Sequence, residues 1–191
     1  MKSQTGFAGI KKIINLDSTT AGIENLAKLT RLDLSSNNLI QLPENIGKLI
    51  EITWLYVDNN KLVTLPAEIG KLTNLYFLSV KSNCIEFLPP EIEKLVRLTS
   101  LDLSENKLSS LPTEIGQLAS LNSLNLRGNQ LTSLPESLYQ LKNLEELNLE
   151  KNPLPIPPEI LEKVKEPQTI LRYYFSHLKK SLNESKSLVV G

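Results

Sequence analysis

The chain has 191 residues, 40% of them hydrophobic and 22% charged, and its 21 lysines and arginines balance its 21 aspartates and glutamates. This composition is typical of a globular domain and excludes a chain that is disordered throughout. The neutral charge and the lack of basic clusters interleaved with aromatic residues argue against nucleic acid as a partner, since phosphate binding needs such clusters.

Residues 1–25 carry an incomplete copy of a pattern that the rest of the chain repeats every 23 residues. Leu16 and Ile23 fit this pattern, but Ile14 stands where every later copy has an asparagine. We therefore expect residues 1–25 to form an N-terminal cap and a degenerate first repeat. Ile10 belongs to its apolar cover, either in a helical turn or in an irregular strand.

Residues 26–157 contain six asparagines at a constant spacing of 23 residues. Around the fourth of them the sequence reads L-x-x-L-x-L-x-x-N-x-L, which is the signature of the leucine-rich repeat. The predicted fold is an α/β solenoid of six such repeats, a horseshoe with a parallel sheet on its concave side. The aligned asparagines are Asn37, Asn60, Asn83, Asn106, Asn129 and Asn152.

Within each repeat, apolar and polar residues alternate around L-x-L, which predicts a short strand with one buried side. An asparagine amide offers two donors and an acceptor, so the aligned asparagines are expected to form a buried ladder that satisfies backbone groups beside the strand. A Leu-Pro pair follows, as at Leu111 and Pro112, and we expect the strand to end there.

A return segment completes each repeat. Ile115 and Leu118, at i and i+3, favour a helical turn on the convex side. Gly116 has the same register position as Glu93 and Tyr139, so we interpret glycine there as permitted and not required.

The outward-facing strand positions are the candidate binding residues, because the concave face of such a solenoid is open to solvent. Trp54, Tyr56 and Phe77 are predicted to form an exposed aromatic patch, and tryptophan and tyrosine are common at interface hot spots. The alternative is that long neighbouring side chains or the N-terminal segment cover these rings. Phe87 is a weaker candidate. The predicted partner-binding residues are Arg31, Asp33, Trp54, Tyr56, Asp58, Phe77, Ser79, Lys81 and Asp102.

Residues 158–184 read as a C-terminal helical cap and linker. Ile170, Leu171, Tyr174 and Phe175 recur at helical spacing after Pro167, which indicates an amphipathic helix across the last coil. A cap is favoured over a binding helix because a solenoid exposes its core at its ends.

No catalytic, cofactor or metal site is predicted in this segment. Cys84 and His177 are the sole thiol and imidazole, and about four coils separate them. Asp102 and its neighbouring carboxylates are expected on an open face, with no pocket to shift a pKa. One cysteine cannot form an internal disulfide, and no apolar run suits a signal peptide or membrane span, so we expect a cytoplasmic protein without a membrane partner.

The motif L-P-x-x-I-G-x-L, as at residues 65–72, resembles the 23-residue repeats of intracellular scaffold, plant and Roco proteins. The tail after Asn152, with its N-P-L-P-I-P-P-E-I run and the I-L-R-Y-Y-F helix, resembles the junction between repeats and Roc GTPase domain in bacterial Roco proteins. Residues 185–191 would then begin the first GTPase strand, and Gly191 would be the first phosphate-loop glycine.

That resemblance implies a regulatory, non-catalytic arm of a larger protein whose Roc and COR domains bind GTP or GDP, hydrolyse GTP and dimerise. The arm would contact the Roc-COR module or another protein. Two alternatives remain: a free-standing scaffold of the Ras-associated type, or a repeat-bearing bacterial effector whose chemistry lies outside this segment.

Overall fold

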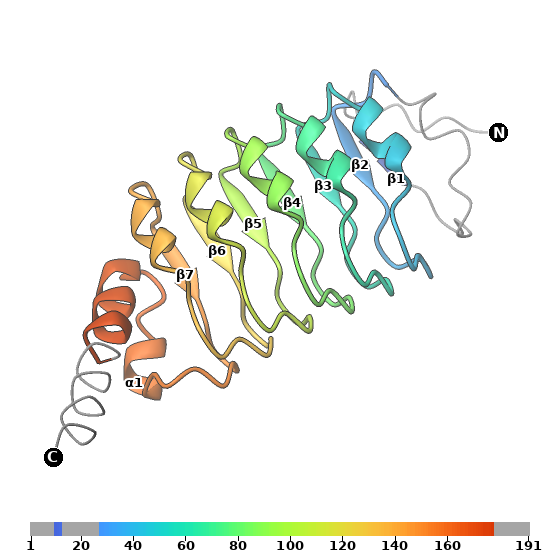
Figure 1. Ribbon diagram of the computed structural model, residues 1–191. Coiled ribbons are helices and arrows are strands. Elements are labelled where there is room, and N and C mark those ends of the chain that lie inside the picture. The colour runs from blue at the N-terminus through green and yellow to red at the C-terminus, as the bar shows by residue number, and fades with distance from the viewer. Residues whose placement is uncertain (1–9, 13–26, 178–191) are drawn as a thin grey trace, which may run out of the picture.

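The computed structural model describes residues 10–12 and 27–177 (Figure 1). Among these residues, the strands form one parallel seven-stranded sheet in which chain order is also spatial order. This arrangement confirms the predicted solenoid with a parallel sheet. The strands are β1 (Ile10–Lys12), β2 (Arg31–Asp33), β3 (Trp54–Tyr56), β4 (Phe77–Ser79), β5 (Ser100–Asp102), β6 (Ser123–Asn125) and β7 (Glu146–Asn148).

The register of the sheet follows the 23-residue repeat from β2 onward, so Trp54 lies beside Phe77 and Phe77 beside Ser100. The first interval differs. Ile10 pairs with Arg31 across 21 residues, so the expected 23-residue register does not extend to β1. Of the two conformations expected for Ile10, the structure has the strand. Ile14, Leu16 and Ile23 lie outside the described residues.

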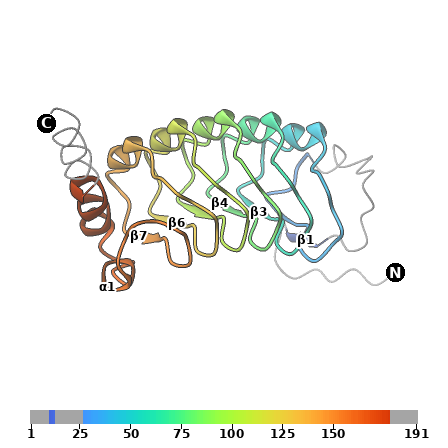
Figure 2. The ribbon, with the colours of Figure 1, turned by 60° about the horizontal axis from the view of Figure 1, so that its bottom comes forward.

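The return segments are 3₁₀ helices, which line the side of the solenoid opposite the strands (Figure 2). The expected helical turns are thus confirmed, in their tighter i→i+3 form. Each begins directly after the proline of a Leu-Pro pair, whose extended backbone forms its N-cap. They are η2 (Glu44–Lys48), η3 (Ala67–Lys71), η4 (Pro90–Lys94), η5 (Thr113–Gln117) and η6 (Glu136–Gln140).

The expected strand end at Leu-Pro is corrected by the structure. Strand β5 ends at Asp102, ten residues before Pro112. Isolated backbone bonds still join neighbouring coils beyond the strands, for example from Gln130 N to Leu108 O at 2.9 Å. The backbone hydrogen bonds between neighbouring coils therefore end at the proline. The 3₁₀ helix begins directly after it, because the fixed φ of proline suits a helix start.

The core consists almost entirely of the repeat leucines and isoleucines. Leu55, Leu78 and Leu124, the middle residues of their strands, are at most 1% exposed. Full burial of one such side chain contributes roughly 1.5–3 kcal/mol. Since each coil contributes several, the apolar core is continuous along the solenoid.

The predicted asparagine ladder is confirmed by its hydrogen bonds. Asn106 donates from Nδ2 to Leu103 O of its own coil and Val80 O of the preceding coil, each at 3.0 Å. Its Oδ1 accepts from Ile85 N at 3.0 Å. Asn60, Asn83 and Asn129 repeat this arrangement and are also buried. Asn152 makes the same bonds from a half-buried position, so each ladder asparagine from Asn60 onward joins two coils. Asn37, also half-buried, donates to Leu34 O and Ser35 O of its own coil.

The residue before each ladder asparagine has a left-handed backbone. Positive φ values of 54–58° occur at Ser36, Asn59, Ser82, Glu105 and Lys151, and Gly128 has φ 70°. A non-glycine residue in this region costs roughly 1–2 kcal/mol. Recurrence in successive coils shows that the turn into the asparagine requires this conformation.

The register position in the 3₁₀ helices accepts Glu93 and Tyr139 as well as glycine, as interpreted from the sequence, but packing leaves no room for a side chain at Gly70 and Gly116. A Cβ on Gly116 would lie 2.5 Å from Ser137 O, and one on Gly70 would lie 2.6 Å from Glu91 O. Glu93 occupies the same register position, so the closeness of the coils varies along the solenoid. A register position alone does not reveal that variation.

The C-terminal elements cover the end of the core (Figure 1). Helix α1 (Pro158–Leu161) is followed by a helix whose described residues are 167–177. Ile170 and Leu171 are fully buried, and Tyr174 and Phe175 are 2% and 6% exposed. The Tyr174 hydroxyl also accepts a hydrogen bond from Leu134 N at 3.1 Å.

Candidate protein-interaction surface

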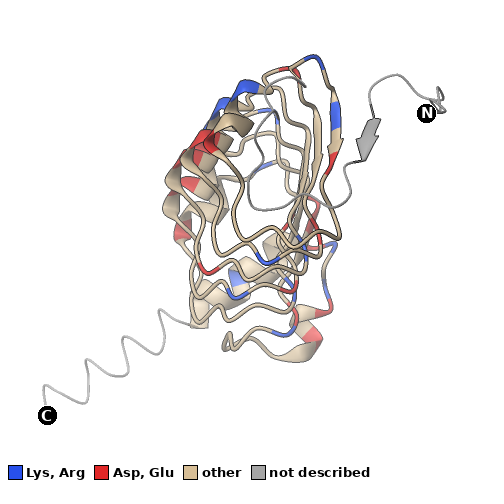
Figure 3. Ribbon diagram, turned by 90° about the vertical axis from the view of Figure 1, so that its right-hand side faces the viewer, with Lys and Arg blue, Asp and Glu red and all other residues tan. Residues whose placement is uncertain are grey.

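The concave face presents the first and third residues of strands β3, β5, β6 and β7, in which the middle residue is buried. The middle residue is buried in β2 and β4 as well, and in β4 the third residue, Ser79, is also buried. All nine predicted partner-binding residues lie in strands β2 to β5 or within two residues after them. The side chains are therefore arranged in rows one strand spacing apart, about 4.8 Å. Lysine and arginine are interspersed with aspartate and glutamate along the ribbon (Figure 3).

Trp54, Tyr56 and Phe77 pack together as predicted, and we call these three residues the aromatic platform. The Phe77 ring centroid lies 4.9 Å from that of Trp54 and 4.9 Å from that of Tyr56. The Trp54 and Phe77 rings are within 17° of parallel. Such ring pairs contribute about 0.5–1.5 kcal/mol beyond the area they bury.

Arg31 covers one side of this platform. Its Cζ lies 4.7 Å from the Trp54 ring centroid, which is within the range of a cation–π interaction. The platform residues are half-buried, whereas we had predicted an exposed patch. Mutual stacking and Arg31 account for the difference, so the alternative of coverage by long neighbours is correct in part. Most of the N-terminal segment lies outside the described residues.

Asp58 lies next to the platform and accepts hydrogen bonds from Ser79 Oγ at 2.5 Å and from Lys81 N at 2.9 Å. Burial raises the pKa of the Asp58 carboxyl, and the nearby charge of Asp102 raises it further, although both hydrogen bonds and the Lys81 charge lower it. The shifted pKa of Asp58 was not predicted from the sequence, where the expectation concerned Asp102 and the carboxylates of the later coils.

The second half of the concave face is polar. Asp102 Oδ1 accepts from Ser104 N at 2.9 Å, and its Oδ2 accepts from Asn125 Nδ2 at 3.2 Å. Arg127 lies between Glu105, at 2.5 Å, and Glu150, at 3.4 Å. The charge of Arg127 is therefore already balanced within the domain.

Exposed apolar side chains also occur along the edges of the solenoid, and most were not predicted from the sequence. Phe87, the weaker sequence candidate, and Ile40 are each 55% exposed, and Val63 is 45% exposed. Ile40 and Val63 are 23 residues apart, so the register itself was the signal that could have revealed their shared edge. The others are Ile50, Tyr76 and Val96.

Within residues 10–12 and 27–177, no three His, Cys, Asp or Glu side chains are grouped to hold a metal ion. In the same part of the chain, no helix has both the length and the apolar composition needed to cross a bilayer. A hollow of about 240 Å³ is lined by Arg31, Leu32, Asp33 and Tyr56.

The chain is similar to known repeat proteins. The family described as "leucine-rich repeat region" matches residues 14–103, and the family described as "leucine rich repeat" matches residues 96–154. The structure matches that of the Leptospira interrogans LRR protein LIC12759 with a TM-score of 0.56 and 42% sequence identity. The match covers 76% of this chain and 42% of the Leptospira chain.

Other comparisons add no function. No curated protein shows significant similarity to the chain. In contrast, 358 solved chains match it, so the likeness identifies an architecture that many proteins share. Family matches, structural likeness, parallel sheet and asparagine ladder agree: this chain contains a leucine-rich repeat domain.

Proposed function

We propose that this domain binds a protein partner through its concave face and is not itself catalytic. The aromatic platform is the observation that carries this proposal. Its rings lie on an open sheet face and keep part of their surface accessible to solvent. These apolar side chains are therefore not part of the buried core. Half-buried tryptophan and tyrosine are typical anchors of protein interfaces.

The proposal is tested by measuring binding with Phe77→Ala against a matched control. Phe87→Ala removes the same ring from an edge position outside the platform. We expect Phe77→Ala to weaken partner binding more than tenfold and Phe87→Ala to change it less than twofold. Equal effects of the two substitutions would contradict a concave binding site.

We also expect the platform substitution to affect stability. The double substitution Trp54→Ala with Phe77→Ala removes two of the three platform rings. Both rings are half-buried and stacked, so the pair should cost about 1–3 kcal/mol. Binding must therefore be compared at a temperature where every variant is folded, as judged by circular dichroism.

More specifically, we propose that the domain is the regulatory arm of a cytoplasmic bacterial Roco GTPase. The support is the resemblance of the tail, from Asn152 to Gly191, to the repeat–Roc junction. Residues 178–191 of this tail lie outside the described residues. The family matches end at residue 154. GTP or GDP would bind the Roc domain, and dimerisation would occur mainly through Roc and COR.

The gene sequence beyond the codon for Gly191 tests this identity. A continuation x-x-x-x-G-K-[ST] would supply the phosphate loop and support the Roco proposal. The arm could then be titrated against its nucleotide-loaded Roc-COR module, with Trp54 fluorescence as the reporter. An unrelated continuation would refute it and favour a free-standing scaffold of the Ras-associated type.

A further inference from the structure

We infer that the partner segment carries an apolar or aromatic side chain that stacks on the aromatic platform, followed by a lysine or arginine that pairs with Asp102. This inference rests on the proposed concave-face function and specifies the chemistry of the partner. It depends on three features: the stacking of the platform rings, the position of Arg31, and the charge of the neighbouring rows.

The platform rings are stacked and do not enclose a ligand. Trp54 is within 17° of parallel to Phe77 and within 24° of parallel to Tyr56, and the Tyr56 and Phe77 planes differ by 39°. A cage for a quaternary ammonium group needs rings that face it from several sides. Nearly parallel rings 4.9 Å apart lie face to face, so the stack instead offers its Phe77 end to one flat or branched apolar side chain.

Arg31 makes the platform asymmetric. Its guanidinium occupies the Trp54 side and repels a second cation there. On the opposite side, β5 presents the small Ser100 beside Phe77, and Asp102 follows two residues later. A segment bound on the platform and running toward β5 therefore meets the small side chain of Ser100 and the negative charge of Asp102.

Asp102 has no cationic partner among the described residues. Its hydrogen bonds come from Ser104 and from the neutral amide of Asn125. The nearest lysine on the face is Lys81, whose charge acts on Asp58. A lysine or arginine of the partner would therefore form a new charge-assisted bond with Asp102.

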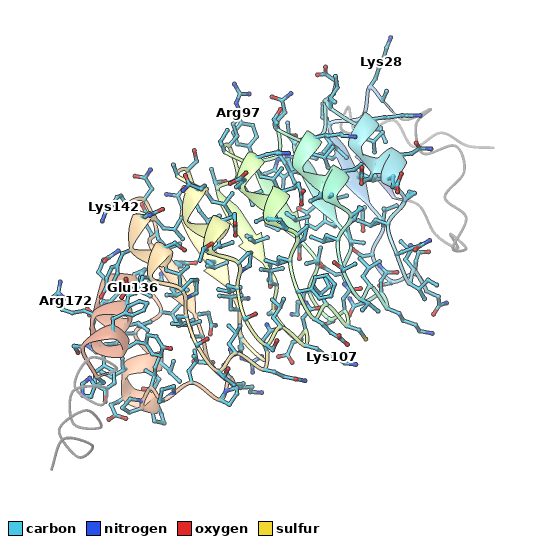
Figure 4. All side chains as sticks on the ribbon, in the orientation of Figure 1. Lys28, Arg97, Lys107, Glu136, Lys142 and Arg172 are labelled. Atoms are coloured by element: carbon cyan, nitrogen blue, oxygen red, sulfur yellow. The ribbon has the colours of Figure 1, made fainter. Side chains whose placement is uncertain are left out.

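The other cations do not offset this charge. Arg127 is held by Glu105 and Glu150. Arg97 projects from one edge of the solenoid and Lys107 from the other, away from the strand rows (Figure 4). Along strands β2 to β7 and the residues just after them, carboxylates at Asp33, Asp58, Asp102, Glu146 and Glu150 outnumber the cations Arg31, Lys81 and Arg127, although Lys165 from the C-terminal cap pairs with Glu146 at 3.9 Å.

The register fixes the spacing of the two contacts. Tyr56, Ser79 and Asp102 are aligned across three neighbouring strands, and Ser79 is only 4% exposed. Tyr56 and Asp102 are therefore two strand spacings apart, about 10 Å. An extended segment covers that distance in about three residues, at roughly 3.3 Å per residue.

A random peptide library displayed on phage and selected on the full 191-residue chain tests the inference. We expect the enriched peptides to combine an aromatic or branched apolar residue with a lysine or arginine two to four positions away. Their binding, measured by fluorescence anisotropy of the synthetic peptides, should fall more than tenfold with Phe77→Ala. It should fall about fivefold or more with Asp102→Asn, and hardly at all with Phe87→Ala.

The outcomes separate this inference from the proposed function. Peptides that depend on Phe77 but lack basic residues, or that tolerate Asp102→Asn, would overturn the inference and leave concave-face binding intact. If no selected peptide depends on Phe77, both are overturned. Sensitivity to Asp102→Asn should also decrease in high salt, because an ion pair at a surface is screened.

Discussion

Asn106→Ala is the substitution that tests most directly how the coils are held together. It removes the acceptor of Ile85 N, which has no other hydrogen bond among the described residues. A buried N–H left without a partner costs about 1–3 kcal/mol. Three carbonyls also lose a donor, but Val80 O keeps its bond from Asn83, Leu103 O keeps its bond from Asn129, and Ser104 O keeps its bond from Ser82 N.

The expected total loss is therefore about 3.5 kcal/mol: about 2 kcal/mol for the orphaned amide and about 0.5 kcal/mol for each of the three weakened carbonyls. Asn125→Ala is the matched control, because it removes the same amide from a half-buried position on the concave face. There Arg127 N loses an acceptor close to solvent. The control should cost less than about 1 kcal/mol.

Urea unfolding followed by circular dichroism and by Trp54 fluorescence measures both free energies. Trp54 lies in β3 and Asn106 follows β5, so coincident transitions show that the coils unfold together. A loss below about 1 kcal/mol for Asn106→Ala, or one equal to that of the control, would refute the role assigned to the ladder.

Three further predictions concern packing, the cap and pH. Gly116→Ala should cost about 1–3 kcal/mol in urea unfolding, because the new Cβ would lie 2.5 Å from Ser137 O; an unchanged midpoint would contradict this. Tyr174→Phe should cost about 1–3 kcal/mol by leaving Leu134 N unpaired, and a neutral effect would mean that water replaces the hydroxyl. Asp58 has a raised pKa, so its favourable contribution is present below its ordinary value of 3.8 and is lost as pH rises through the raised value. Asp58→Asn should therefore gain stability relative to the wild type as the pH rises above 3.8, and a pH-independent difference would exclude this linkage.

The sequence was sufficient to predict the strands, the ladder and the grouping of the platform residues. All three follow from one 23-residue period: it places Trp54 beside Phe77 and aligns asparagines whose amides match the unpaired backbone groups. The need for glycine at Gly116 could not be predicted, because it depends on how closely two particular 3₁₀ helices approach.

Two other features could not be predicted from the 23-residue period. The burial of the platform results from ring orientations and from the rotamer that places Arg31 over Trp54. The pairing of Ile10 with Arg31 breaks the period, so no extrapolation from later coils could find it.

The asparagine ladder has a direction, and this makes the two ends of the domain unequal. Each ladder side chain reaches back toward the N-terminus, so the Ile85 amide is satisfied only by the coil that follows it. Deleting coils from the C-terminal side therefore leaves a buried donor unpaired, whereas deletion from the N-terminal side removes only one of two acceptors from an amide. Shortened versions of this domain should tolerate loss of leading coils far better than loss of trailing ones, and whole 23-residue units can be exchanged without changing the ladder's geometry.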